Sequence, residues 1–60
     1  MRVIVDAFGG DDAPLAVLQG CELALKEYDG VEITLVGDIP TMKKVASEHQ
    51  IDLSQMELIQ

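Results

Sequence analysis

The sequence predicts a parallel α/β sheet segment in which strands and helices follow one another in the order β-α-β-α-β. Three short, largely apolar runs at residues 3–5, 31–36 and 56–59 have the length of strands. Amphipathic helical patterns separate them, and each of the first two runs leads through a glycine, an aspartate and a proline into a helix. Strands that alternate with helices pair in parallel through right-handed crossovers, so we expect a parallel sheet.

The first strand, residues 3–5, consists of β-branched residues. Such continuous apolar runs are typical of strands that are buried on both faces. Glycines and aspartates at residues 8–12 then break the strand. Pro14 opens a helix, where its missing N–H costs little because the first-turn N–H groups have no intrahelical partner. Asp11 or Asp12 can cap this helix, and either carboxylate would interact favourably with its positive end.

The first helix is expected to end before Gly30, because glycine often terminates helices. Its apolar stripe follows helical spacing and comprises Val17, Cys21, Ala24, Leu25 and Tyr28. Cys21 is the only cysteine, so it can form no intrachain disulfide and is expected to be a small core residue. Gly20 lies within the helix at a cost of roughly 1 kcal/mol relative to alanine. Close packing of the helix on the sheet would explain this glycine.

The second strand, residues 31–36, leads into Gly37-Asp38-Ile39-Pro40 and a second helix, which Asp38 is expected to cap. The apolar positions of this helix follow the spacing i, i+3, i+4, i+7 and are Met42, Val45, Ala46 and His49. His49 is the only histidine and belongs either to this face or to the last turn, where a proton would suit the negative helix end. A connection at 51–54 precedes the third strand at 56–59.

The net charge of −7 argues against binding to nucleic acid, because phosphate backbones require clustered lysines and arginines. The four basic residues are dispersed apart from one adjacent pair; they are Arg2, Lys26, Lys43 and Lys44. No apolar run approaches the length of a membrane span or has the form of a signal peptide, so a cytoplasmic location is expected. Two helices cover a three-stranded sheet poorly, and we therefore expect residues 1–60 to be the N-terminal part of a single α/β domain whose remainder is absent.

The loop between the first strand and the first helix is the candidate ligand site. Open α/β sheets bind ligands at the carboxyl ends of their strands, where Asp6 and this loop are expected to lie. The backbone of Gly9 and Gly10 can approach a ligand closely, and the helix start directs N–H groups at it, which suits a phosphate or carboxylate. Asp11 and Asp12 would repel an anion unless they cap the helix or a cation balances them. A tight turn with a capped helix remains the alternative interpretation.

The glycine spacing in this loop matches neither the dinucleotide-binding fingerprint nor the P-loop. Asp6, Asp11 and Asp12 could instead supply oxygen ligands to a hard cation. The chain would then be a non-catalytic α/β binding or regulatory module with an acidic metal-binding loop. A third hypothesis is a non-catalytic segment that completes a sheet in a larger assembly. Asp38 is expected at the same sheet edge as Asp6 and Asp11.

Residues 5–14, Val-Asp-Ala-Phe-Gly-Gly-Asp-Asp-Ala-Pro, resemble the N-terminal signature of the PlsX family of phosphate acyltransferases. Residues 35–38, Leu-Val-Gly-Asp, are similar to the second strand and turn of that family. Phe8 stands where methionine is usual, and Asp12 adds a charge at a variable position. Members of the family are several times longer than this chain, so most of such an enzyme is missing here.

The resemblance implies a Rossmann-like fold, a three-layer α/β/α sandwich similar to isopropylmalate dehydrogenases and phosphotransacetylases. It implies transfer of a fatty acyl group from the thioester of acyl carrier protein to inorganic phosphate, which gives an acyl phosphate for phospholipid synthesis. It also implies a cytoplasmic homodimer with peripheral membrane contact and no metal or organic cofactor. Substrate-binding residues are then expected among Asp6, Gly9, Gly10, Asp11 and Asp38, whereas catalytic residues must come mainly from outside this segment.

Overall fold

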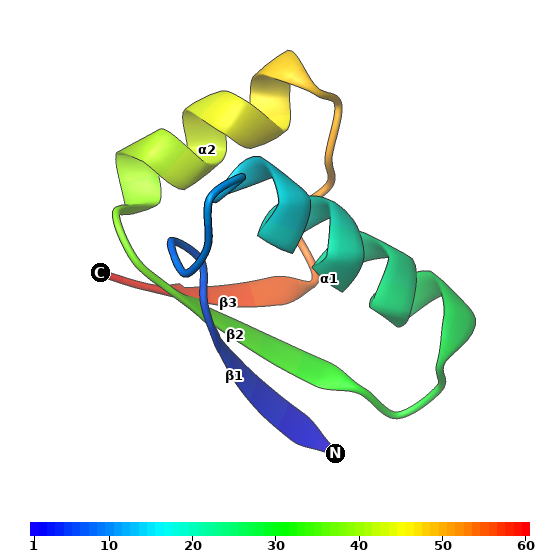
Figure 1. Ribbon diagram of the computed structural model, residues 1–60. Coiled ribbons are helices and arrows are strands. Elements are labelled where there is room, and N and C mark those ends of the chain that lie inside the picture. Colours follow the sequence, from blue (N-terminus) through cyan, green and yellow to red (C-terminus); the bar gives the residue numbers. More distant parts are fainter.

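A computed structural model describes all 60 residues and confirms the predicted β-α-β-α-β order (Figure 1). The elements are β1 (Arg2–Asp6), α1 (Leu15–Glu27), β2 (Glu32–Val36), α2 (Ile39–Glu48) and β3 (Met56–Ile59). The three strands form one parallel sheet in the order β1-β2-β3, so β2 is its central strand. None of the helices is both long enough and apolar enough to cross a lipid bilayer.

Both helices lie on the same face of the sheet (Figure 1). Successive right-handed crossovers that advance in one direction across a parallel sheet place their helices on one side. The strand register aligns Val5 with Leu35 and Leu35 with Leu58, and all three side chains belong to the core beneath the helices or pack against it. The helices and this row of side chains therefore enclose one hydrophobic core.

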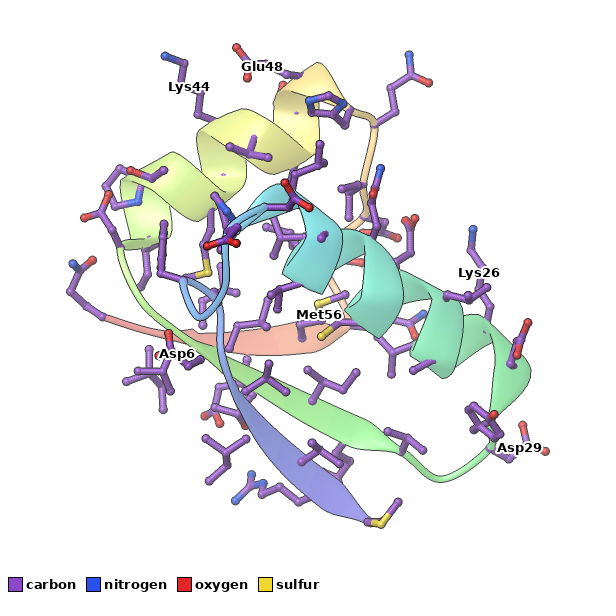
Figure 2. All side chains as sticks on the ribbon, viewed as in Figure 1. Asp6, Lys26, Asp29, Lys44, Glu48 and Met56 are labelled. Atoms are coloured by element: carbon purple, nitrogen blue, oxygen red, sulfur yellow. The ribbon has the colours of Figure 1, made fainter.

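The core is small and is centred on β2. Its fully enclosed large side chains are Leu18, Leu35 and Met42. Cys21 is also buried, as predicted, and burial raises the pKa of its thiol, which disfavours the nucleophilic thiolate. Met56 is buried as well, and Figure 2 shows it between the helices and the sheet. In the same view Lys44 and Glu48 extend away from the core on the outer side of α2.

Two predictions about the helix faces need correction. Helical spacing predicts Tyr28 on the apolar stripe of α1, but Tyr28 follows the last helical residue and is 62% exposed. Leu18 occupies the inner face instead and is fully buried. His49 is exposed at the end of α2, so its assignment to the last turn is confirmed and the apolar-face alternative is wrong. Both errors fall at a helix end, where the chain turns away from the periodic pattern.

Gly20 does not mark a close approach between α1 and the sheet, contrary to the prediction. A Cβ atom at this position would meet no atom of the sheet within 4 Å. Gly20 instead borders an apolar groove between α1 and β1, together with side chains such as Val3 and Ala24. The reason is that β1 is an edge strand, so no further strand supports this side of α1.

The opposite face of the sheet carries no helix and presents both apolar and polar side chains. Ile4 is 68% exposed there and Ile59 is 45% exposed. Between them, the hydroxyl of Thr34 donates a hydrogen bond of 2.9 Å to Glu57, whose carboxylate lies 3.9 Å from the guanidinium of Arg2. A buried polar group must keep a hydrogen-bond partner, and the Glu57 carboxylate satisfies Thr34.

Candidate functional site

The carboxyl ends of the strands bring two loops to one edge of the sheet. The backbone N–H of Ala7 donates to Val36 O at 2.9 Å, and the N–H of Gly37 donates to Ile59 O at 2.9 Å. These bonds extend the sheet one residue past β1 and β2 and place the loop after Asp6 beside the turn at Asp38. The structure therefore brings the predicted binding segments to the same edge, as expected for parallel strands.

Asp6 organises the first loop. Its carboxylate accepts a hydrogen bond of 2.9 Å from the backbone N–H of Phe8, and its carbonyl accepts a longer one of 3.4 Å from Gly9. This is the local side-chain-to-backbone bonding by which aspartate stabilises turns. Gly10 follows with a φ of +108°, a conformation that residues with a side chain rarely adopt. The loop therefore depends on Asp6 for its turn and on Gly10 for its backbone path.

The first helix begins without a side-chain cap, so of the two alternatives for Asp11 and Asp12 the capping role is wrong. Pro14 is the N-cap residue, and no side chain accepts a hydrogen bond from the first turn. The main-chain carbonyl of Asp12 accepts from Ala16 N at 3.1 Å, whereas its carboxylate is exposed. The helix starts three residues after Asp12, so the Asp12 side chain is not at the N-cap position. Only its main-chain carbonyl accepts a hydrogen bond from the first turn.

Several N–H groups around this helix start are consequently free. The backbone N–H groups of residues 10–13 donate no hydrogen bond within the protein, nor do those of Leu15 and Val17. Unpaired N–H groups at the positive end of a helix are the donors that bind phosphate and carboxylate groups in proteins. The loop is thus able to accept an anion through its backbone.

The second helix begins in a different way, since its N-terminus is filled by side chains. Asp38 caps α2, as predicted, by accepting a hydrogen bond of 3.1 Å from the backbone of Thr41 and another from the Thr41 hydroxyl. Gln60 reaches over from the end of β3, where its side-chain amide donates to Asp38 at 3.2 Å and accepts from Ile39 N at 3.1 Å. Hydrogen bonds from Thr41 and Gln60 hold the pKa of Asp38 below its ordinary value.

These two helix starts share an Asp-x-Pro sequence but differ in whether their N–H groups are paired. Asp38 and Gln60 satisfy the donors of α2, whereas the donors at the start of α1 remain available. Among the predicted binding residues, Gly9, Gly10 and Asp11 therefore lie on the loop with free donors, while Asp38 performs a local structural task. The contribution of Gln60 could not be found from sequence, because only the sheet register brings it to α2.

The three aspartates proposed as a cation site do not form one. Asp6 directs its carboxylate to the backbone of Phe8. No three histidine, cysteine, aspartate or glutamate side chains lie in an arrangement that could hold a metal ion. The geometry therefore gives no support to the hypothesis of a module with an acidic metal-binding loop.

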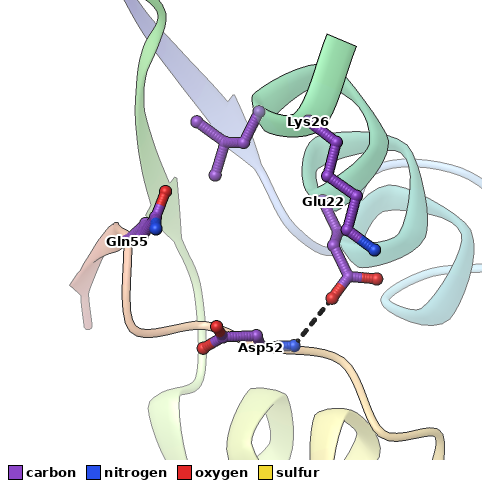
Figure 3. Close-up of a pocket in the computed structure, with 5 residues that line it drawn as sticks. Glu22, Lys26, Asp52 and Gln55 are labelled. Atoms are coloured by element: carbon purple, nitrogen blue, oxygen red, sulfur yellow. Dashed lines mark hydrogen bonds between the residues drawn. The ribbon is translucent and has the colours of Figure 1, made fainter.

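A second polar cluster lies between α1 and the turn before β3 (Figure 3). The carboxylate of Glu22 accepts a hydrogen bond of 2.9 Å from the backbone of Asp52, and Asp52 in turn accepts one from Ser54 N at 2.9 Å. The bond from Ser54 and the charge of Lys26 hold the pKa of Asp52 below its ordinary value. These groups fasten the connection before β3 to α1, and no sequence motif marked them.

The cap at Asp38 predicts a specific dependence of stability on pH. Because the pKa of Asp38 is lowered from 3.8 in the folded chain, its contribution is fully present above that value and is lost as the pH falls through the lowered pKa. We expect Asp38→Asn to flatten the acid limb of a melting-temperature profile measured by circular dichroism, because asparagine caps without titrating. Asp38→Ala should lower the melting temperature by several degrees at neutral pH.

Asp11→Asn is the matched control for this prediction, since the Asp11 carboxylate is exposed and caps nothing. Its acid profile should follow that of the unaltered chain. Identical profiles for Asp38→Asn and the unaltered chain would contradict the assignment of the cap.

Fold and site together define a Rossmann-like parallel α/β segment with an open, glycine-rich helix start at the carboxyl edge of its sheet. A family model described as "Fatty acid synthesis protein" matches residues 1–60, and the chain belongs to that family. The match covers the whole segment, including both strand-to-helix turns.

Similar chains include phosphate acyltransferases from several bacteria. The one from Acetivibrio thermocellus is 40% identical over 58 residues, which are 97% of this chain and 17% of the relative. The one from Acholeplasma laidlawii is 41% identical over 49 residues, which are 82% of this chain and 15% of the relative. The one from Bacillus licheniformis is 43% identical over 49 residues, with the same coverage. The chain thus spans about one-sixth of the length of these relatives.

Proposed function

We propose that this chain is part of an enzyme that transfers a fatty acyl group from the thioester of acyl carrier protein to inorganic phosphate. The observation that carries the proposal is the set of unpaired backbone N–H groups at residues 10–13 and at the start of α1. Inorganic phosphate is an anion of the kind that such a helix start binds. The names of the relatives, phosphate acyltransferases, support the same reaction class.

In the proposed reaction a phosphate oxygen attacks the carbonyl carbon of the acyl thioester. A carbon–oxygen bond forms, the carbon–sulfur bond breaks, and the carrier thiolate leaves and takes up a proton. The product is an acyl phosphate. The loop at Gly9 and Gly10 would hold the phosphate near the thioester, since positioning alone contributes much of the rate enhancement in such reactions.

Stabilisation of the negative charge that develops on the thioester oxygen requires further donors. Residues 6–14 contain no lysine, arginine, histidine or side-chain amide. The catalytic groups are therefore expected outside residues 1–60, and the segment alone should be inactive. Asp11 and Asp12 are exposed and free of capping duties, so a cation from the rest of the enzyme would be needed to balance them beside bound phosphate.

The remaining features of the proposal follow from the same reaction class. We place the enzyme in the cytoplasm, as a homodimer with peripheral contact to the membrane that receives its product. Residues 1–60 would be the first part of its α/β domain, and the exposed sheet face around Ile4 and Ile59 would be covered by the rest of a three-layer α/β/α sandwich.

The test is a chimera in which residues 1–60 replace the matching segment of the phosphate acyltransferase from Acetivibrio thermocellus. We expect the chimera to convert acyl carrier protein thioester and phosphate to acyl phosphate, measured by phosphate-dependent release of the carrier thiol. The 60-residue chain alone serves as the inactive control. A chimera that folds, as judged by cooperative thermal unfolding, but releases no thiol would contradict the proposal.

A further inference from the structure

The ring of Phe8 lies directly against Gly37, the residue that follows β2. A Cβ atom at Gly37 would collide with the ring atoms Cδ2 and Cε2 of Phe8 and would lie 3.6 Å from the Cβ of Ala7. The φ of Gly37 is +155°. Only glycine therefore leaves space for the ring, and the contact joins the first strand-to-helix loop to the second.

The contact between Phe8 and Gly37 is a tertiary contact of the loop whose N–H groups at residues 10–13 are unpaired. Residues 9–12 are exposed, and two of them are glycines without a side chain. Phe8 is also exposed, at 37%, but it carries the only large apolar side chain between Ala7 and Pro14. The remaining hydrogen bonds of the turn are local, from Phe8 and Gly9 to Asp6.

We propose that Phe8 is a positioning residue that acts through its contact with Gly37 to hold the Gly9-Gly10 backbone in its anion-binding conformation. The inference rests on the proposed binding of phosphate at this loop. Glycine-rich backbone has many accessible conformations, so a loop without its anchor populates the binding conformation for only a fraction of the time. The apparent affinity for phosphate falls in proportion to that fraction.

The expected kinetic signature is specific to phosphate. In the chimera, Phe8→Ala should raise the KM for phosphate about tenfold, as for a loop that is competent about one-tenth of the time, while kcat and the KM for the acyl thioester change little. Phe8→Met should restore the KM, because methionine is also long and apolar. Leu23→Ala is the control for loss of an exposed apolar side chain, since Leu23 is 55% exposed on α1.

Two measurements separate this inference from the proposed function. Glycine-selective NMR of the chimera should show the Hα signals of Gly37 shifted by the aromatic ring, and Phe8→Ala should remove the shift. Titration with inorganic phosphate should move the amide signals of Gly9 and Gly10, and Phe8→Ala should weaken that binding about tenfold even if the chimera transfers no acyl group.

A double-variant cycle completes the test. Gly37→Ala displaces the ring, so the effects of Phe8→Ala and Gly37→Ala on phosphate affinity should be less than additive, as for two residues in one contact. Additive effects would overturn the inference. It would equally be overturned by an unchanged phosphate affinity in Phe8→Ala, or by a failure of phosphate to perturb Gly9 and Gly10 in the unaltered chimera.

Discussion

Leu35→Ala is expected to abolish cooperative unfolding of the 60-residue chain. Leu35 is fully buried in the central strand, between its register partners Val5 on β1 and Leu58 on β3. Truncation of a buried leucine costs about 2–5 kcal/mol, because it removes apolar contacts and leaves a cavity. A domain of this size rarely has more than about 3–5 kcal/mol of stability from one core. The substitution therefore removes most or all of the stability of the folded chain.

The measurement is thermal unfolding followed by circular dichroism, in the chain and in the chimera, where the same change should lower the melting temperature. Leu23→Ala is the matched control, since it makes the same chemical change at a side chain that is 55% exposed. Its cost should stay within about 0.5 kcal/mol. Equal losses from the two substitutions would show that the core is not centred on β2.

Gly10→Val should reduce kcat/KM for phosphate in the chimera by about 100-fold, the effect expected when binding groups are misplaced by about 1 Å. Gly10 has a φ of +108°, and valine is strongly disfavoured in that region. The loop must therefore adopt another backbone path, which redirects the free N–H groups at residues 10–13. Beyond the neighbouring residues, no atom lies within 4 Å of a Cβ at Gly10, so the change acts through local backbone strain and not through a clash with another part of the chain.

Gly30→Val is a closely matched control for this effect. Gly30 also has a positive φ, +74°, and a Cβ at this position would likewise meet no atom within 4 Å beyond the neighbouring residues. It lies between α1 and β2, at the amino edge of the sheet, far from the proposed phosphate site. Both variants should lose stability, but only Gly10→Val should lower kcat/KM for phosphate. Equal kinetic losses would indicate a general folding defect and remove the loop from the mechanism.

Much of the fold could be predicted from local patterns. The β-branched run at β1 and the apolar run at β2 predicted the strands, and the spacing of Met42 and Ala46 predicted the buried face of α2. These predictions succeed because strand and helix periodicity are properties of neighbouring residues. Tyr28 and His49 were harder to place, because the periodicity stops where a helix ends and its position depends on the following turn.

The candidate site was predicted only in outline. The position of the loop at the sheet edge follows from the strand–helix order. Whether a side chain caps the N–H groups at each helix start does not follow from it. Asp12 and Asp38 have the same spacing to proline, yet α2 begins directly after Asp38 whereas α1 begins three residues after Asp12. Sequence reasoning therefore allowed a capping role for both aspartates, and the structure confirms it only for Asp38.

The sequence by itself determined the order of strands and helices, the parallel sheet and the edge at which the glycine–aspartate loop lies. The tertiary structure alone decided which helix start keeps free donors and what holds the loop in place. Gln60 completes the cap of α2 from a position 22 residues away from Asp38, and Phe8 anchors its loop on Gly37 from a different strand end. Such contacts depend on the register of the assembled sheet, and no pattern among neighbouring residues encodes that register.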